Sequence, residues 1–173
     1  MNKKIMYIIT ILSTAVLLFL DQIAKYLAVL HLKGQAAIPI IKNVFELQYL
    51  ENQGAAFGIM QGKKTFFVIG TLIFLVIVGI LYHNIPLTKR FTPIRIVAVL
   101  IVAGAIGNMI DRVVHQYVID FFYFKLINFP IFNVADIYVV VACILFILLM
   151  LFYYKEAELG QIFPFMKNKK AEE

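Results

Sequence analysis

The chain has 173 residues, of which 62% are hydrophobic, and its mean hydropathy is +0.89. Soluble globular domains are usually about 45–50% apolar, so this composition excludes an ordinary soluble domain and indicates a membrane protein. The formal net charge of +6 does not indicate nucleic-acid binding, because the Lys and Arg residues cluster at the ends of apolar runs, where they would meet lipid headgroups.

Four apolar segments predict four transmembrane helices, because a spanning helix needs about 20 residues. The first and third segments reach this length only if their polar ends, which carry Asp21 and Asp111, are included. No small-residue cleavage site follows the first segment, so it is expected to be retained as a span. We therefore expect an all-α polytopic membrane protein that forms a single membrane domain over 1–173. The spans are expected at about 5–24, 65–82, 93–111 and 136–154.

The charges between the spans favour cytoplasmic termini. Four spans place both termini on one side, which then carries nine Lys and Arg residues against seven on the other side. The positive-inside rule favours this orientation, although Lys63 and Lys64 beside the second span argue against it. The resulting layout has outer loops at 25–64 and 112–135, a cytoplasmic loop at 83–92, and a charged cytoplasmic tail at 155–173 that we expect to fray.

The first outer loop contains a strand pattern. Phe45, Leu47 and Tyr49 alternate with polar residues, which is the period-two pattern of a half-buried strand. We expect a small extracytoplasmic β-sheet in this loop, with its apolar face toward lipid or substrate. These three side chains are expected to cradle a substrate chain from above.

The stretch from Gly104 to Asp136 contains three of the four Asp residues in the chain, which are Asp111, Asp120 and Asp136. An aspartate near the bilayer core costs roughly 2.5–3.5 kcal/mol on insertion scales, which suggests a functional reason for this stretch. The fourth, Asp21, ends the first span, and the order of the segments places all four at the same face of the membrane. With cytoplasmic termini, that face is the outer one.

Several other catalytic chemistries are poorly supported. Ser13 is the only serine and Cys143 the only cysteine, and both lie inside apolar spans away from any histidine in sequence. A single thiol also cannot form an internal disulfide. The three histidines form no H-E-x-x-H motif, so a zinc hydrolase is not supported. The aspartates remain as candidates.

A pair of carboxylates can cleave an amide without a covalent intermediate. Two carboxylates about 4 Å apart repel by roughly 4 kcal/mol at an effective dielectric of 20, which corresponds to about three pKa units. Such a pair is expected to hold one proton near neutral pH. The ionised member can then take a proton from water, while the protonated member hydrogen-bonds the scissile carbonyl.

The candidate carboxylates also have structural explanations. Asn133 could cap the fourth helix, with Asp136 favourably placed in its first turn. Asp120, in contrast, has no capping role available and is the strongest candidate for chemistry.

Charged neighbours could explain the other two aspartates. Asp111 and Arg112 could form a local ion pair at a helix end, and Asp21 and Lys25, four residues apart, could form another. Asn108 lies four residues before Arg112 on the same helix face, so these two side chains could brace a site together.

Five short motifs occur along the chain in a fixed order. They are DQIAK at 21–25, NQGAAF at 52–57, GNMIDR at 107–112, VIDF at 118–121 and FNVAD at 132–136. With these motifs on a four-span scaffold, the chain resembles the lipoprotein signal peptidase (signal peptidase II) family of bacterial inner-membrane aspartic peptidases. The similarity covers nearly the whole chain.

The resemblance implies that Asp120 and Asp136 are the catalytic dyad. It implies a substrate, the signal peptide of a prolipoprotein, cut just before a cysteine that carries diacylglycerol. It also implies inhibition by the cyclic peptide globomycin and no metal or organic cofactor. We further expect a monomer in contact with membrane lipid. The supporting or substrate-contacting residues implied by the resemblance are Asp21, Lys25, Asn52, Gly54, Asn108, Asp111, Arg112, Asn133 and Ala135.

Two other functional classes would use these residues differently. A small transporter or proton pathway would use membrane aspartates as relays, but it predicts acids along a path open to both sides, whereas all four lie at one face here. A non-enzymatic scaffold predicts that replacing Asp120 by Asn leaves a folded and functional protein.

Overall fold

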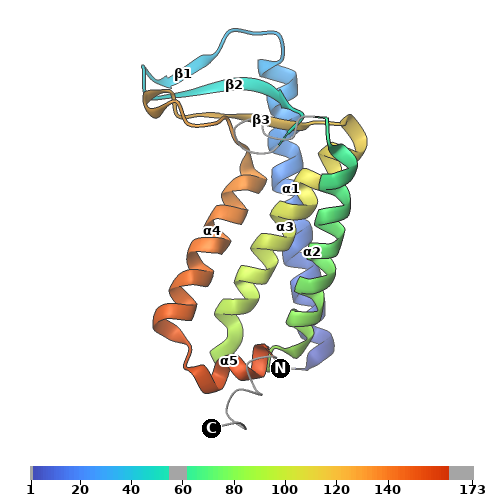
Figure 1. Cartoon of the computed structure of the whole chain (residues 1–173). Helices are drawn as coiled ribbons and strands as arrows, with labels where there is room; N and C mark the ends of the chain where they lie inside the picture. The colour runs from blue at the N-terminus through green and yellow to red at the C-terminus, as the bar shows by residue number, and fades with distance from the viewer. Residues whose placement is uncertain (1, 55–61, 164–173) are drawn as a thin grey trace.

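The computed structural model describes residues 2–54 and 62–163. Four long helices run side by side, and a small sheet lies across one end of them (Figure 1). The helices are α1 (Lys3–Leu32), α2 (Lys64–Asn84), α3 (Thr92–His115) and α4 (Val134–Leu148), which continues as a π-helix (Leu149–Tyr153). The remaining elements are β1 (Ile38–Ile41), β2 (Phe45–Asn52), β3 (Val118–Tyr123), the short helix α5 (Glu156–Ile162), and 3₁₀ turns at Lys89–Phe91 and Lys125–Ile127.

The four long helices are apolar on nearly all sides. In α2, Tyr82 is the single buried residue, while large apolar side chains such as Phe66 and Ile73 are more than half exposed. A helix that is apolar all round but not covered by protein requires a lipid environment. All four helices are long and apolar enough to cross a membrane. The predicted set of four apolar helices is thus confirmed, and α1 continues beyond its predicted span to Leu32.

Helix α3 lies at the centre and contacts α1, α2 and α4. Two glycines allow this close approach. A Cβ at Gly104 would lie 2.5 Å from the carbonyl oxygen of Ala135, and a Cβ at Gly107 would lie 2.6 Å from Oδ2 of Asp21. The beginning of α4 and the middle of α1 can therefore meet α3 directly, which brings three helices together just beneath the sheet (Figure 1).

The sheet has the antiparallel order β1-β2-β3, and β3 comes from the second predicted outer loop. The sequence predicted a sheet from the first loop alone, so this strand was missed. The four residues from Val118 to Phe121 are all buried, and a strand that is buried on both faces shows no period-two pattern. In the β2–β3 register Asp120 lies opposite Leu50, so the strand pairing positions the carboxylate.

The apolar face of β2 is directed at the protein's own core. Leu47 and Tyr49 pack against a buried cluster that contains Ala28 and Leu32 of α1. The expectation that this face lies toward lipid or substrate is therefore wrong, because α1 is longer than predicted and reaches the sheet. The β2–β3 register shifts between Leu47 and Leu50, which interrupts the alternation of side chains, and Gln48 and Leu50 are exposed.

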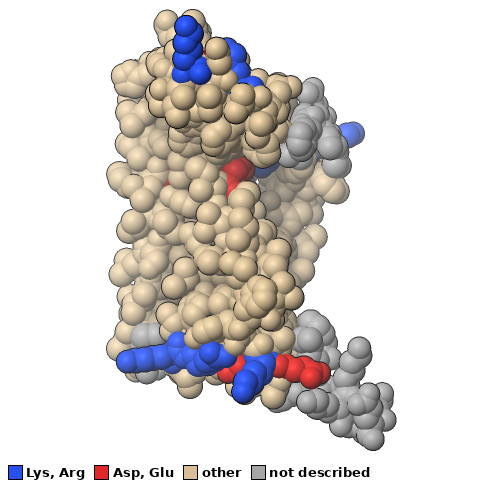
Figure 2. Space-filling view, turned by 90° about the vertical axis from the view of Figure 1, so that its left-hand side faces the viewer, with Lys and Arg blue, Asp and Glu red and all other residues tan. Residues whose placement is uncertain are grey.

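The opposite end of the bundle is closed by α5. The Arg90 guanidinium donates to both carboxylate oxygens of Glu158, at 2.9 and 3.1 Å, and lies 3.8 Å from the Tyr153 ring centre. Ile162 is 1% exposed and belongs to the same core cluster as Met6. The expectation that the tail frays from residue 155 is thus wrong for 156–162, and its later residues lie outside the described range. Figure 2 shows Lys and Arg side chains gathered at this end.

Candidate active site

The two strongest candidate carboxylates, Asp120 and Asp136, come from different elements and are here called the cavity pair. Asp120 lies within β3, and Asp136 lies in the first turn of α4. Asn133 is the N-cap of α4: its Oδ1 accepts from the backbone N–H of Asp136 at 3.0 Å, and Asp136 Oδ2 accepts from the backbone N–H of Asn133 at 3.0 Å. This capping box confirms the predicted cap and leaves Oδ1 of Asp136 for another contact.

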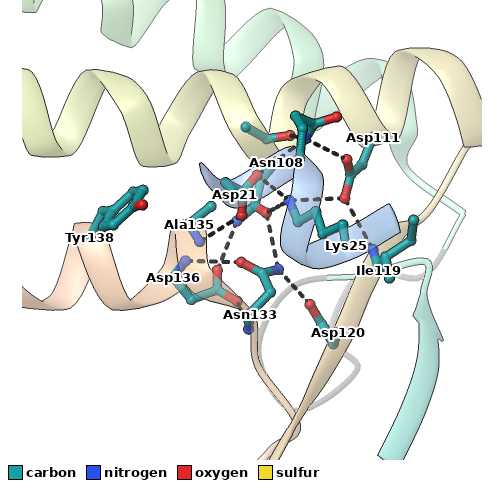
Figure 3. A network of polar contacts seen from close by, with 12 residues as sticks. Asp21, Lys25, Asn108, Asp111, Ile119, Asp120, Asn133, Ala135, Asp136 and Tyr138 are labelled. Carbon is teal, nitrogen blue, oxygen red and sulfur yellow. Dashed lines mark hydrogen bonds and ion pairs between the residues drawn. The ribbon is translucent and has the colours of Figure 1, made fainter. Parts of the chain in front are cut away.

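Amide groups hold all four oxygens of the cavity pair, and Figure 3 shows the contacts made by Asn108 and Asn133. Asp120 Oδ1 accepts from Asn133 Nδ2 at 2.6 Å, and Asp120 Oδ2 accepts from Asn52 Nδ2 at 2.8 Å. Asp136 Oδ1 accepts from Asn108 Nδ2 at 2.7 Å, and Asn133 Nδ2 also donates to Asn108 Oδ1 at 3.1 Å. The two carboxylates are thus linked through two asparagines. Each oxygen can accept a second hydrogen bond, which leaves capacity for water or a substrate group.

The protonation of Asp120 is shifted toward the physiological range. The side chain is 1% exposed, and burial together with the nearby charge of Asp136 raises the pKa of Asp120 to about 7. Hydrogen bonds from Asn52 and Asn133 act in the other direction. Asp120 therefore exists as a mixture of protonated and ionised forms near neutral pH.

The cavity pair opens to a cavity of about 580 Å³, which is within the usual size range of ligand sites. In Figure 2, acidic side chains are visible in a recess beneath the end that carries the sheet. The polar lining residues besides the pair are Asn52, Asn108 and Arg112. The apolar lining comes from the segment before α4 and from α4 itself, and includes Phe124, Phe129, Pro130, Ile131, Phe132, Ile137, Val140 and Val141.

The other two aspartates, Asp21 and Asp111, share one lysine and are here called the Lys25 pair. Lys25 Nζ lies 2.9 Å from Asp21 Oδ2, 3.0 Å from Asp111 Oδ2 and 3.1 Å from Asn108 Oδ1. An ammonium group has three N–H donors, and here each has an acceptor. The Asp21–Lys25 pair is confirmed, whereas the local ion pair expected between Asp111 and Arg112 is replaced by the bond from Asp111 to Lys25.

The Lys25 pair also binds the backbone beside the cavity pair. Asp21 Oδ1 accepts from the N–H of Ala135 at 2.9 Å, and Asp111 Oδ2 accepts from the N–H of Ile119 at 3.1 Å. Each of these two residues directly precedes a member of the cavity pair, and Figure 3 shows both contacts. The Lys25 pair therefore connects α1 and α3 to the two elements that carry the cavity carboxylates.

Arg112, in the last turn of α3, supports the site by bonding to the segment that follows β2. Its Nη2 donates to the carbonyl of Gly54 at 3.0 Å, and its guanidinium lies 4.7 Å from the Phe67 ring centre. The N–H of Gly54 donates to Asn52 Oδ1 at 3.0 Å, which directs the amide nitrogen of Asn52 to Asp120. All the sequence-predicted site residues are thus part of one connected region, while 55–57 of the second motif lie outside the described residues.

Two parts of the site were not predicted from the sequence, namely Gln22 and the aromatic cavity wall. Gln22 Nε2 lies 3.1 Å from Asp21 Oδ2 and 3.2 Å from Asp111 Oδ1, so it joins both members of the Lys25 pair. Gln22 lies within the first motif, DQIAK at 21–25, and this position was the signal that could have identified it. The aromatic wall was indicated by the density of Phe residues between Phe121 and Phe132. Within the described residues, no group of three or more His, Cys, Asp or Glu is placed to bind a metal ion.

Comparisons with known proteins agree with this architecture. The family model for Signal peptidase (SPase) II matches residues 13–152. The lipoprotein signal peptidase of Clostridium novyi is 44% identical over 139 residues, which are 78% of this chain and 91% of that protein. The lipoprotein signal peptidase of Caldanaerobacter subterraneus is 45% identical over 145 residues, or 82% and 95% of the two chains.

Two solved structures described as bacterial membrane enzymes share the fold. One is 34% identical with a TM-score of 0.73 and covers 82% of this chain and 87% of that chain. The other is 33% identical with a TM-score of 0.71 and covers 84% of this chain and 94% of that chain. The chain belongs to the signal peptidase II family.

Proposed function

We propose that this protein is an aspartic endopeptidase of the bacterial cytoplasmic membrane that removes the signal peptide from prolipoproteins, cutting just before the diacylglyceryl-modified cysteine. Membership of the family supports cleavage of lipoprotein signal peptides, over the transporter and scaffold alternatives. The observation that carries the aspartic mechanism is the cavity pair itself. Two buried carboxylates, held only by amide donors among the described contacts, face one largely apolar cavity.

The environments of the cavity pair suggest separate roles. Asp120 has a pKa raised to about 7 and serves as the proton holder, whereas Asp136 accepts a backbone N–H at a helix N-terminus, which stabilises a carboxylate. Asp136 takes a proton from water, and the hydroxide oxygen bonds to the scissile carbonyl carbon while Asp120 donates a hydrogen bond to the carbonyl oxygen. The proton then passes from Asp136 to the leaving nitrogen as the C–N bond breaks.

The cavity wall supports an apolar, lipid-bearing substrate. Side chains of α4 such as Ile137, Val140 and Val141 line the cavity and are exposed on the outside of the bundle. A signal peptide helix and acyl chains could therefore enter sideways from the bilayer. The site lies at the sheet end, while the N-terminus and α5 lie at the other end (Figure 1). Cytoplasmic termini would place the site near the outer face, where globomycin-type inhibitors would also bind to the cavity pair.

The test uses the purified full-length protein and a synthetic lipidated precursor. Wild-type protein should release a product whose mass begins at the modified cysteine, and globomycin should block its release. Asp120→Asn and Asp136→Asn should each lower the cleavage rate by roughly 10²- to 10⁴-fold, while accumulating normally in membranes. Glu158→Gln, the same carboxylate-to-amide change at the far end, should leave cleavage unchanged. Normal cleavage by either Asp variant would end the proposal.

A further inference from the structure

A second cavity, of about 640 Å³, adjoins the one that holds the cavity pair. The two cavities have four lining residues in common: Asn52, Phe129, Pro130 and Ile131. They are therefore neighbouring compartments, and the wall that they share includes Asn52, the residue bonded to Asp120. The proposed mechanism uses only the first compartment.

The two compartments differ in chemistry. The first is lined mainly by aromatic and branched apolar side chains. The second has the side-chain amides of Gln48, Gln53 and Asn128 in its wall. Side-chain amides both donate and accept hydrogen bonds, which matches the N–H and C=O groups of a peptide backbone. The one carboxylate in the lining, Glu51, is paired with Lys33 at 2.8 Å, so this wall does not select for a charged ligand.

Strand β2 connects the two compartments. Gln48, Leu50 and Asn52 of this strand all line the second cavity, and the β2–β3 register shifts between Leu47 and Leu50. A strand rises about 3.3 Å per residue, so the backbone covers at most about 13 Å from Asn52, beside Asp120, to Gln48. An extended peptide that leaves the cavity pair along β2 would pass about four residues over the lining of the second cavity.

We propose that the second cavity binds the first residues of the mature lipoprotein, those that follow the lipidated cysteine, in an extended conformation and with a preference for polar residues. This inference rests on the proposed function. The signal peptide and the acyl chains match the apolar compartment, so the hydrophilic part of the substrate beyond the scissile bond is left for the polar one. Gln48 then contributes to specificity without acting on the reacting atoms.

The experiment pairs three enzymes, the wild-type protein and two variants, with two substrates. One lipidated precursor carries four polar residues after the modified cysteine, and the other ends at that cysteine as an amide. Gln48→Leu is compared with Gln35→Leu, the same change at an exposed position that lines neither cavity. We measure kcat and KM for each combination.

Wild-type protein and Gln35→Leu should cleave the long substrate roughly threefold to tenfold more efficiently than the short one, as expected for one or two hydrogen bonds. Gln48→Leu should lose most of this preference, mainly through KM, and cleave the short substrate at the wild-type rate. An equal loss on both substrates, or no preference in the wild-type protein, would overturn the inference. Failure of wild-type protein to cleave either substrate would instead contradict the proposed function.

Discussion

The cavity pair and the Lys25 pair are two sets of aspartates in one network, and their partners differ in kind. Asp21 and Asp111 share the ammonium group of Lys25, and both are almost fully buried. Asp120 and Asp136 are bonded by asparagine amides and a backbone N–H, and both line a cavity. Figure 3 shows the two sets joined through Asn108 and Asn133.

This difference separates a framework from a reactive site. The carboxylates of the first set share a cation and bind the backbone, so they hold helices and strand in a fixed arrangement. A buried carboxylate bonded only by neutral amides can gain or lose a proton within the physiological range, as the raised pKa of Asp120 indicates. The first set positions the backbone next to the second, through Ala135 and Ile119.

The largest effect is expected from removing the shared cation. Lys25→Met leaves two buried carboxylates without their partner, which should lower the free energy of unfolding by about 3–5 kcal/mol. Lys33→Met is the control. Lys33 forms an ion pair with Glu51, and the two side chains are 52% and 36% exposed. Such surface pairs contribute about 0–1 kcal/mol to stability. Thermal unfolding in detergent measures both variants. Equal decreases in melting temperature for the two variants would show that the Lys25 pair is not a framework.

A smaller effect is expected from crowding the contact between the two sets. A Cβ at Gly107 would lie 2.6 Å from Asp21 Oδ2 and 3.2 Å from the Ala135 Cβ. Gly107→Ala should therefore cost about 1–3 kcal/mol in stability and lower kcat, because the start of α4 is displaced. Gly79→Ala in α2 meets no atom within 4 Å, and it should be neutral or slightly stabilising, as Ala favours helix. If the two variants behave alike, close packing at Gly107 is not required.

The mildest test changes only pH. With a pKa of about 7 for Asp120, the cleavage rate should fall toward tenfold per pH unit above pH 7, as the proton holder ionises. The carboxyl has a pKa raised from 3.8, so the folded protein binds a proton that the unfolded chain has released. Stability should consequently decline as pH rises from about 4 to 7 and level off above that.

Asp120→Asn provides the control for this pH dependence of stability. The amide does not titrate, so the decline between pH 4 and 7 should be reduced in this variant. An unchanged stability profile would assign the titration to a different group.

Much of the fold could be predicted because it depends on local sequence patterns. Apolar runs identify the four helices, and the alternation of Phe45, Leu47 and Tyr49 identifies β2. Strand β3 and helix α5 could not be predicted in this way. Residues of β3 are buried on both faces, and α5 has only 7 residues and depends on contacts such as that between Glu158 and Arg90.

The sequence by itself determined that the aspartates gather at one end of a four-helix membrane protein, because the order of apolar runs sets which helix ends lie together. The tertiary structure alone decided which carboxylate meets which partner. Lys25 and Asp111 belong to different helices and meet because Gly107 allows those helices to approach closely. Asp120 reaches the start of α4 because β3 pairs with β2. Such contacts depend on packing between distant segments, which no local pattern encodes.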